Sequence, residues 1–581
     1  MAIEQDKKFI VYKSSAGSGK TFTLVREYLR IVLKNPESFR QVLAITFTNK
    51  AANEMKDRVL KNLVVLAEPE KNPDSDTIIH MLPKLSAQLN LGHAEIKSRA
   101  EMVLRLIMHH YAEFAVSTID SFTHRVIRTF SHDLKIPMNF EVELDADLIL
   151  SEAVDLLVSQ VGTEEKLTRV MIDFIEKKTG EEQSWQIEKD LNDFSRSLLS
   201  ESSIDAVNEI RNYDLESFMK VRNSLMQWKI TWEKFLSSRA KEIYDLINNE
   251  GLTSGDFIQK DRGIINYLKS LSAGMFDKIK PNSFAETAFK SGEWISQKSS
   301  PNQKAAFQRI ENPVLDLGKQ IYDRICHELP RYVLCKLLLN NLFSTALLCE
   351  VEKTLNSLCL DNNKLLISEF NRRISQIVRE QPAPFIYERL GEKYHHFLID
   401  EFQDTSIMQW HNLLPLIENS LASSRMNMVV GDAKQAIYRW RSGDAEQFEK
   451  LPYLIRPDSD ALLGSREKTL VSQYKKEDLD ENFRSSPVIV DFNNRLFESI
   501  FRSMPQEHGI AYKNVRQTAA KKDKPGMVKL MRIGKPDAED EKYDQKVHAK
   551  IKEIIGELSE DHFNFKDIAI LCRKNEKAAK I

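Results

Sequence analysis

A short glycine-bearing loop, residues 14–21, carries the residues best suited to chemistry. It reads SSAGSGKT and follows the apolar residues 9–11. Glycines let backbone N–H groups turn toward a phosphate, the Lys20 ammonium can reach the β- and γ-phosphates, and the Thr21 hydroxyl can bind Mg²⁺. The pattern predicts a nucleotide phosphate site made of Ser14, Ser15, Ala16, Gly17, Ser18, Gly19, Lys20 and Thr21. Ser14 is unusual, because such loops commonly begin with glycine.

Two adjacent acids, Asp400 and Glu401, directly follow the apolar residues 397–399. A carboxylate at a strand end can hold the hydrated Mg²⁺ of a nucleotide, and a second carboxylate can activate a water molecule for attack on a phosphate. We therefore expect Asp400 to be a metal ligand, together with Thr21, and Glu401 to be the catalytic base. Adjacent acids also occur on solvated surfaces, so it is the phosphate loop that favours the catalytic interpretation.

The segments around these residues alternate between strand and helix patterns. The predicted strands cover residues 9–11, 41–48, 114–118, 395–400 and 426–431, and predicted helices follow at 22–33, 49–58 and 119–125. Such alternation predicts an α/β fold with a parallel, doubly wound sheet.

Two further regions have a different character. Residues 137–384 have helical periodicity throughout, with a polar loop at 290–304, and therefore form a helical insertion within the first α/β domain. Beyond residue 480 we expect a helix and two strands, at 527–533 and 567–572, as the start of a second α/β domain in which the sequence stops.

Composition limits the remaining possibilities. The 581 residues suffice for several domains, and 42% hydrophobic with 29% charged residues indicates a soluble globular protein without an uninterrupted apolar run of about 18 residues. A net charge of −2 requires any polyanion site to be local. The five cysteines form no C-x-x-C pair, and the histidine pairs at 109–110 and 395–396 lack partners at ligand spacing, which argues against a metal cluster. The N-terminus has no signal-peptide features, so we expect a cytoplasmic protein.

Five motifs resemble, in chain order, those of the UvrD/Rep superfamily 1 helicases. They are SSAGSGKT at 14–21, AITFTNKAANEM at 44–55, DEFQDTS at 400–406, GDAKQAIYRWR at 431–441 and ENFRSSP at 481–487. The SAGSGKT form, the DEFQDT wording and the large insertion are most similar to the RecB/AddA branch, the helicase-nuclease subunits of double-strand-break repair. The resemblance covers the whole chain, although the insertion matches only in position and helical character.

This resemblance implies a motor that uses ATP and Mg²⁺ and has P-loop, RecA-like domains. Residues 1–136 and 385–480 would form the two parts of the first RecA-like domain, residues 137–384 the helical insertion, and residues 481–581 the truncated start of a second RecA-like domain. The family's later motifs and a nuclease domain do not occur in these 581 residues. We therefore expect this segment to be the N-terminal part of a longer chain, and to bind and turn over nucleotide poorly by itself.

The resemblance also implies roles around ATP. Residues at the positions of Gln403 and Gln435 contact the γ-phosphate or the attacking water, which suits an amide that donates and accepts. Arg484 would stabilise transition-state charge as an arginine finger. Phe483 stands where relatives often stack a tyrosine on adenine. The implied catalytic residues are Lys20, Glu401, Gln435 and Arg484, and the nucleotide contacts include Gln403 and Phe483.

A track for single-stranded DNA is implied as well. Phe47, Tyr438 and Trp440 fall where the family stacks aromatic side chains on bases, and Asn49, Lys50 and Arg441 lie nearby for phosphates or coupling. Stacking tolerates any base and contributes about 1–3 kcal/mol per base. Most aromatic residues are buried in cores, so this assignment depends on the motifs. Asp120 replaces the histidine usual at its position, which leaves that DNA contact open.

The leading hypothesis is an ATP-dependent DNA helicase or translocase of repair or recombination. It would move 3′-to-5′ by analogy, act on single- and double-stranded DNA, and work with a second subunit in an AddAB/RecBCD-like complex. The alternative is a non-catalytic DNA-binding scaffold subunit, whose signature would be loss of one of four residues that are all present: Lys20, Asp400, Glu401 and Arg484. A P-loop kinase would not need the aromatic motif at 438–440.

Overall fold

The computed structural model describes residues 7–132, 140–143, 145–180, 187–366, 369, 371–375, 385–455, 461–504, 515–534 and 543–581. The chain divides into two compact units. One comprises Met1–Tyr12 and Thr23–Glu477, and the other comprises Lys13–Phe22 and Asp478–Ile581.

A six-stranded sheet lies at the centre of the first unit, with the order β3-β2-β6-β7-β1-β8. Its strands are β1 (Phe9–Ser14), β2 (Val42–Thr46), β3 (Val116–Thr118), β6 (His396–Ile399), β7 (Asn427–Gly431) and β8 (Tyr474–Leu479). The pairs β2–β3, β2–β6 and β6–β7 are parallel, and Ile399 lies between Ile45 and Val429. The N–H of Asn427 donates to the carbonyl of Lys8 at 2.7 Å, so β7 and β1 begin at the same edge. The predicted α/β class with a parallel sheet is confirmed.

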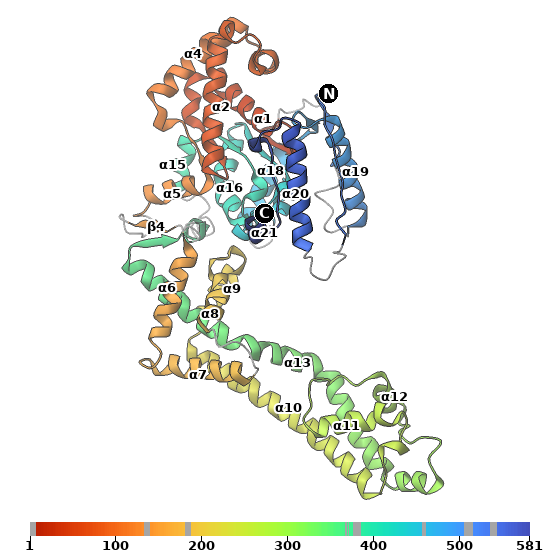
Figure 1. Ribbon diagram of the computed structural model, residues 1–581. Helices are drawn as coiled ribbons and strands as arrows, with labels where there is room; N and C mark the ends of the chain where they lie inside the picture. The colour runs from red at the N-terminus through yellow and green to blue at the C-terminus, as the bar shows by residue number, and fades with distance from the viewer. Residues whose placement is uncertain are drawn as a thin grey trace, which may run out of the picture. The chain divides into compact units, whose positions relative to one another are not determined.

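Burial explains why these segments form strands. All five residues of β2 (VLAIT) and of β7 (NMVVG) are buried, which is typical of parallel strands covered on both faces. Helices that follow the strands begin at side-chain caps: Thr48 caps α2 (Asn49–Ala67), Thr118 caps α5 (Ile119–Thr129) and Ser406 caps α16 (Ile407–Ala422). Other helices of this part are α1 (Lys20–Lys34), α3 (Leu82–Leu89), α4 (His93–His109), α15 (Phe385–Lys393), α17 (Ala445–Lys450) and α18 (Ala461–Gln473) (Figure 1).

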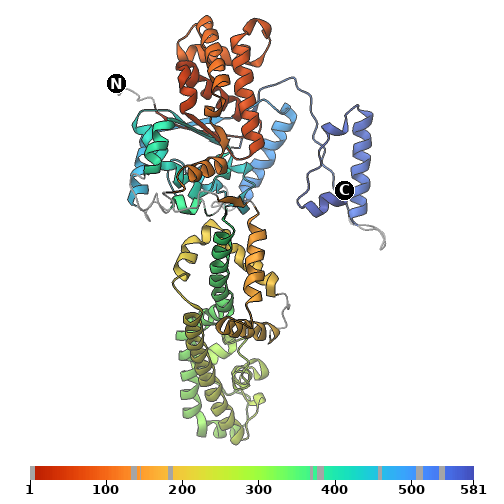
Figure 2. The same ribbon diagram turned by 90° about the vertical axis from the view of Figure 1, so that its left-hand side faces the viewer.

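Helices also dominate between residues 146 and 361. They are α6 (Ala146–Ser159), α7 (Glu165–Gly180), α8 (Ile187–Ser195), α9 (Ile204–Ile210), α10 (Leu215–Asn249), α11 (Ile264–Ser272), α12 (Ser283–Ser291) and α13 (Pro301–Asp361), flanked by the paired strands β4 (Glu141–Glu143) and β5 (Lys364–Leu366). Helices α10 and α13 run alongside each other (Figures 1 and 2), and the Trp232 and Tyr332 rings stack between them at 4.4 Å. These helices have hydrophobic clusters of their own. The loop predicted at 290–304 is shorter in the structure, residues 292–300, because α12 ends at Ser291 and Ser300 caps α13 with Pro301 in its first turn.

Helix α13 carries the longest apolar stretch of these helices. It contains an 18-residue window long and apolar enough, by length and composition alone, to cross a membrane, and 44% of that window is buried. Core helices of soluble proteins pass the same test, and in the apolar part of α13 the buried residues Phe343, Leu347 and Val351 pack in a cluster with α6 residues Ile149 and Val154. We therefore treat α13 as a packed helix.

The second unit contains α19 (Pro487–Ser503), α20 (Tyr543–Glu560), α21 (Asn575–Lys580) and a two-stranded parallel pair, β9 (Glu481–Asn482) with β10 (Thr518–Ala519). The strands predicted at 527–533 and 567–572 are wrong: the described backbone there is irregular apart from a 3₁₀ turn, Phe565–Asp567. A strand needs a neighbour to satisfy its backbone N–H and C=O groups, and neither segment has one among the described residues. Leu530 and Leu571 are accordingly exposed.

Candidate functional site

The predicted phosphate loop joins the end of β1 to the start of α1. Ser14 is the last residue of β1 and Lys20 the first of α1. Gly17 and Gly19 have φ angles of +78° and +82°, a region that favours glycine because side chains with a Cβ clash there. The Ser18 N–H donates to the carbonyl of Ser15 at 3.2 Å, which closes the turn.

This loop has features that suit a bound phosphate. Ser18 Oγ is buried and has no hydrogen-bond partner among the residues that the structure describes, so it can donate to a ligand. Lys20 and Thr21 are half-buried in the first turn of a 15-residue helix, where N–H groups and the helix dipole favour an anion. The buried Ser14 occupies the strand end without a positive φ, so a glycine is not required there.

Asn482 fixes the loop against the segment that holds Phe483 and Arg484. Its Nδ2 donates to the carbonyl of Ala16 at 2.9 Å, and its Oδ1 accepts from the N–H of Arg484 at 2.9 Å. The N–H of Phe483 donates to the carbonyl of Gly17 at 2.9 Å. A Cβ on Gly17 would lie 2.9 Å from Arg484 Cβ, so this approach also requires glycine. The structure thus places Phe483 and Arg484 beside the loop.

The acidic pair lies at the end of β6, in the first unit. The N–H of Asp400 donates to the carbonyl of Ile45 at 2.8 Å, which continues the parallel ladder, and Asp400 Oδ1 accepts from the N–H of Glu401 at 3.0 Å. Glu401 has a φ of +49°, which is rare for a residue with a side chain. Such strain is found at functional sites, where the surrounding structure maintains it.

Gln403 maintains the position of Glu401. Its side chain is 1% exposed, its Nε2 donates to Glu401 Oε2 at 2.8 Å, and its Oε1 accepts from the N–H of Asp432 at 2.9 Å. A Cβ on Gly431 would lie 2.7 Å from that Oε1. Both ends of the amide are therefore used within the protein, and here Gln403 acts as a bridge between β6 and β7.

Asp432 extends the same network toward Gln435. Its Oδ2 accepts from Gln435 Nε2 at 2.7 Å, and its Oδ1 lies 2.8 Å from the Lys434 ammonium. Gln435 is half-buried. The network places two of the predicted ATP residues, Glu401 and Gln435, on one hydrogen-bonded chain.

The side chains of Phe47, Tyr438, Trp440 and Arg441 form an aromatic cluster with one guanidinium group. The Phe47 and Tyr438 ring centroids are 4.2 Å apart, and those of Tyr438 and Trp440 are 6.2 Å apart. The Arg441 guanidinium lies 5.8 Å from the Phe47 centroid and 5.5 Å from that of Trp440. Trp440 is 77% exposed, so its ring is open to solvent. Asn49 and Lys50 lie exposed in the first turn of α2, just after Phe47.

The segment after the acids connects them with this cluster. Asp404 Oδ1 accepts from the N–H of Ile437 at 3.3 Å, and burial raises the pKa of Asp404. The N–H of Asp444 donates to the carbonyl of Thr405 at 3.1 Å, and Ser406 forms an antiparallel bridge with Gly443. Residues 400–406 therefore include Glu401 and Gln403 and also contact residues 436–444, the aromatic loop.

Comparison with known proteins decides the family. A model of the UvrD/REP helicase N-terminal domain matches residues 1–453, most of the chain. The chain belongs to this family.

The relatives of this UvrD/REP helicase chain also agree with the predicted branch. It is 25% identical to the A subunit of an ATP-dependent helicase/nuclease from Streptococcus suis, over 97% of this chain and 45% of the relative. It is 23% identical to the protein of the same name from Lactococcus lactis and 24% identical to the exonuclease/helicase subunit RexA of another strain of that species, in both cases over 100% of this chain and 47% of the relative. The chain thus spans about half the length of the curated relatives it matches.

Two contacts around the candidate site were not predicted from the sequence. Asn482 lies inside the ENFRSSP motif, so its position was visible, but its contacts to Ala16 and Arg484 arise only when the chain folds. Glu201, in the helical region, accepts a hydrogen bond from Ser406 at 2.8 Å. No motif surrounds Glu201, and its position in the sequence carries no signal for this role.

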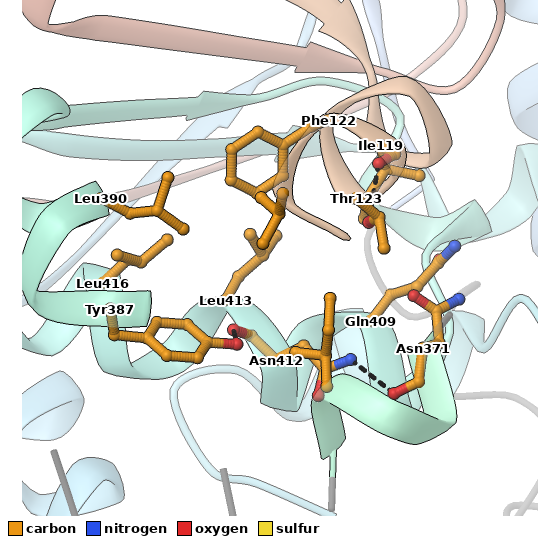
Figure 3. Close-up of a pocket in the computed structure, with 12 residues that line it drawn as sticks. Ile119, Phe122, Thr123, Asn371, Tyr387, Leu390, Gln409, Asn412, Leu413 and Leu416 are labelled. Atoms are coloured by element: carbon orange, nitrogen blue, oxygen red, sulfur yellow. Dashed lines mark hydrogen bonds between the residues drawn. The ribbon is translucent and has the colours of Figure 1, made fainter. Parts of the chain in front are cut away.

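A pocket in the first unit is separate from these residues. It lies between α5, α15 and α16 and is lined mainly by apolar side chains, with Asn371, Gln409 and Asn412 as polar members (Figure 3). None of the predicted ATP or DNA residues is among its lining residues. Groups of three or more histidine, cysteine or acidic residues able to hold a metal are absent from the described part of the chain.

Proposed function

We propose that this chain is the N-terminal motor part of an ATP-dependent DNA helicase that works in repair or recombination. The observation that supports it best is the double contact of residues 400–406. Within seven residues, this segment holds the candidate catalytic base through Gln403 and contacts the backbone of the loop that carries Tyr438, Trp440 and Arg441, through Asp404, Thr405 and Ser406. A motor needs such a connection, because ATP turnover must change its grip on DNA.

In the proposed reaction, the phosphate loop binds the nucleotide. The Lys20 ammonium and the backbone N–H groups around Gly17 and Gly19 neutralise the phosphate charge, and the Ser18 hydroxyl supplies a further donor. Asn482 holds the loop in shape and keeps Arg484 beside it, where its guanidinium would stabilise charge that develops on the γ-phosphate. Phe483 offers an aromatic face for the base.

Glu401 takes a proton from the attacking water in this proposal. Gln403 orients its carboxylate, and Gln435 is placed by Asp432 to orient the water. Thr21 and Asp400 would hold Mg²⁺, and the ion would neutralise negative charge on the nucleotide phosphates. We also propose that the first α/β domain, residues 1–136 and 385–480, and the start of the second, residues 481–581, have the RecA-like fold.

DNA would bind by stacking. Trp440, Tyr438 and Phe47 offer ring faces to bases of any sequence, and Arg441, Lys50 and Asn49 face the phosphates. By analogy with the family we propose 3′-to-5′ movement, action on single- and double-stranded DNA, a partner subunit like that of helicase-nuclease complexes, and a cytoplasmic location.

The test is DNA-stimulated ATP hydrolysis by the full-length protein. Lys20→Ala and Glu401→Gln should each lower turnover at least about 100-fold, and Glu401→Gln should still bind single-stranded DNA. The matched controls are Lys34→Ala, at the other end of α1, and Glu446→Gln, an exposed acid on α17. Unchanged turnover in both test variants would refute the site. DNA binding without any ATP turnover by the wild type would favour the scaffold alternative.

A further inference from the structure

Glu201 connects the helical region to the segment that follows the catalytic acids. It opens a short 3₁₀ turn, Glu201–Ser203, between α8 and α9. Its Oε1 accepts a hydrogen bond from Ser406 Oγ at 2.8 Å, although the two residues are 205 positions apart. The backbone N–H of Met408 also donates to this carboxyl group. Glu201 therefore binds the first turn of α16 from outside that helix.

Ser406, in turn, contacts both α16 and the aromatic loop. It caps α16 because its Oγ accepts from the N–H of Gln409 at 3.1 Å, and its own N–H donates to Gln409 Oε1 at 3.0 Å. On its other side, Ser406 bridges Gly443, which follows Arg441 by two residues. A displacement of Ser406 would therefore move the start of α16 and the aromatic loop together.

Asp120 adds a third element to this junction. It lies in the first turn of α5, and its Oδ1 accepts from Gln409 Nε2 at 3.3 Å. Figure 3 shows Gln409 on α16 facing the α5 residues Ile119 and Thr123. Burial raises the pKa of Asp120, and the positive charge of Arg441 partly opposes this shift. Asp120 takes the place of the family's usual histidine, and here it holds Gln409.

The chemistry of the junction is unlike ordinary packing. A carboxylate that is largely buried beside a second carboxylate costs free energy, which an apolar contact would not. In return, carboxylates form directional hydrogen bonds and interact well with the N-terminus of a helix. Such an arrangement determines the position of Ser406 but adds little to the free energy of unfolding.

We propose that Glu201 is a positioning residue through which the helical region holds Ser406, and with it the loop of Tyr438, Trp440 and Arg441, in the arrangement that binds DNA. The inference rests on the proposed function for its DNA readout, but the contact itself can be tested without ATP turnover. In this arrangement the helical region determines the DNA concentration at which ATP hydrolysis is stimulated, while Glu401 and the phosphate loop determine the rate of hydrolysis.

The experiment compares Glu201→Ala, Glu201→Gln and the control Glu209→Ala in the full-length protein. Glu209 is an exposed acid on the next helix, α9. Glu201→Ala should raise the DNA concentration for half-maximal ATPase stimulation about tenfold and leave the rate without DNA unchanged. Glu201→Gln keeps an acceptor for Ser406 and should restore most of the wild-type response, and Glu209→Ala should have no effect.

Hydrogen exchange provides the second readout. Backbone amides of residues 436–444 should exchange about tenfold faster in Glu201→Ala, with no change in residues 9–14 of β1. Unchanged exchange in 436–444 would overturn the proposal, as would an equal fall of the ATPase rate with and without DNA. If Glu201→Ala does not fold, Glu201→Asp keeps the carboxylate but shortens its reach to Ser406 Oγ, leaves the Ser406 cap of α16 in place, and is judged by the same outcomes. If the proposed ATP site is wrong, Lys20→Ala will leave ATP turnover unchanged. The hydrogen-exchange result does not depend on that outcome.

Discussion

Gln403 Nε2 donates a hydrogen bond to Glu401 Oε2 at 2.8 Å, while the other end of the same amide accepts from the N–H of Asp432. One buried side chain thus determines where the proposed catalytic base points and how β6 and β7 end relative to each other. The family resemblance implies that Gln403 contacts the γ-phosphate or the attacking water. The observed contacts favour a role through Glu401.

Gln403→Ala should therefore lower the turnover number more than it changes the KM for ATP. The substitution releases Glu401 and leaves the N–H of Asp432 without its partner, which costs about 1–3 kcal/mol of folding free energy. We expect turnover to fall about 10- to 100-fold. Steady-state kinetics and urea unfolding measure the two effects. The control is Gln297→Ala, a glutamine between α12 and α13 and far along the chain from the acids; a KM rise without loss of turnover would contradict the positioning role.

Gly431→Ala should disturb the same contact from the other side. The added methyl group would lie 2.7 Å from Gln403 Oε1 and 3.3 Å from the Phe448 ring. We expect a loss of about 1–3 kcal/mol in unfolding free energy, because overpacking in a core forces neighbours to move, together with lower ATP turnover. Gly464→Ala on α18 meets no atom within 4 Å and should leave stability equal or slightly higher. Similar melting temperatures for the two variants would argue against a tight contact at Gly431.

Trp440→Ala should weaken DNA binding without unfolding the protein. The ring is 77% exposed, so its removal sacrifices little buried surface. A lost stacking contact costs about 1–3 kcal/mol, or roughly 5- to 150-fold in Kd. Fluorescence anisotropy with single-stranded oligonucleotides should show the same loss for different sequences. Tyr453→Ala, which removes another exposed aromatic side chain, is the control. A loss confined to one sequence would indicate base-specific contacts in place of stacking.

Asn482→Ala should weaken nucleotide binding although Asn482 itself need not contact ATP. It removes the hydrogen bonds to the Ala16 carbonyl and from the Arg484 N–H. At about 1 kcal/mol for each of these two hydrogen bonds, we expect the Kd of a fluorescent ATP analogue to rise roughly 30-fold. Asn482→Asp keeps the acceptor for Arg484 but loses the donor, so its effect should be smaller. Asn493→Ala, on α19, is the control, and equal affinities for all variants would exclude the bridge.

The junction at Glu201 predicts a dependence of stability on pH. Burial, with a contribution from the charge of Asp120, raises the pKa of Glu201 from 4.5 to about 7. The folded state therefore binds this proton more tightly than the unfolded chain, and the resulting stabilisation is full below about pH 4.5 and is lost as the pH rises through 7. The facing groups are Asp120, Ser406 and the Met408 N–H, with Arg441 near Asp120.

Glu201→Gln removes this titration. Its melting temperature relative to wild type should rise by about 2–4 °C between pH 5.5 and pH 8. Burial lowers the pKa values of His124 and His396, whose titration both proteins share, so the difference between the proteins isolates Glu201. A constant difference across this pH range would contradict the raised pKa.

Much of the architecture could be read from local patterns. The alternation of strands and helices and the burial of VLAIT and NMVVG follow from apolar runs, because a parallel strand covered on both faces has no polar side to display. The predictions at 527–533 and 567–572 failed for the converse reason: these runs resemble strands, but an apolar run becomes a strand only when a neighbour satisfies its backbone, and sequence does not specify that neighbour.

For the candidate site, the sequence by itself determined the kinds of residues and their order: the glycines and lysine of the loop, the adjacent acids, and the aromatic residues with an arginine. These were visible because their chemistry depends on short spacings along the chain. Only the tertiary structure decided which side chains hold them. Gln403 against Asp432, Asn482 against Ala16 and Glu201 against Ser406 join residues 29, 466 and 205 positions apart. Hydrogen bonds over such separations depend on how the sheet, the loop and the inserted helices fold together, and local sequence does not encode that geometry.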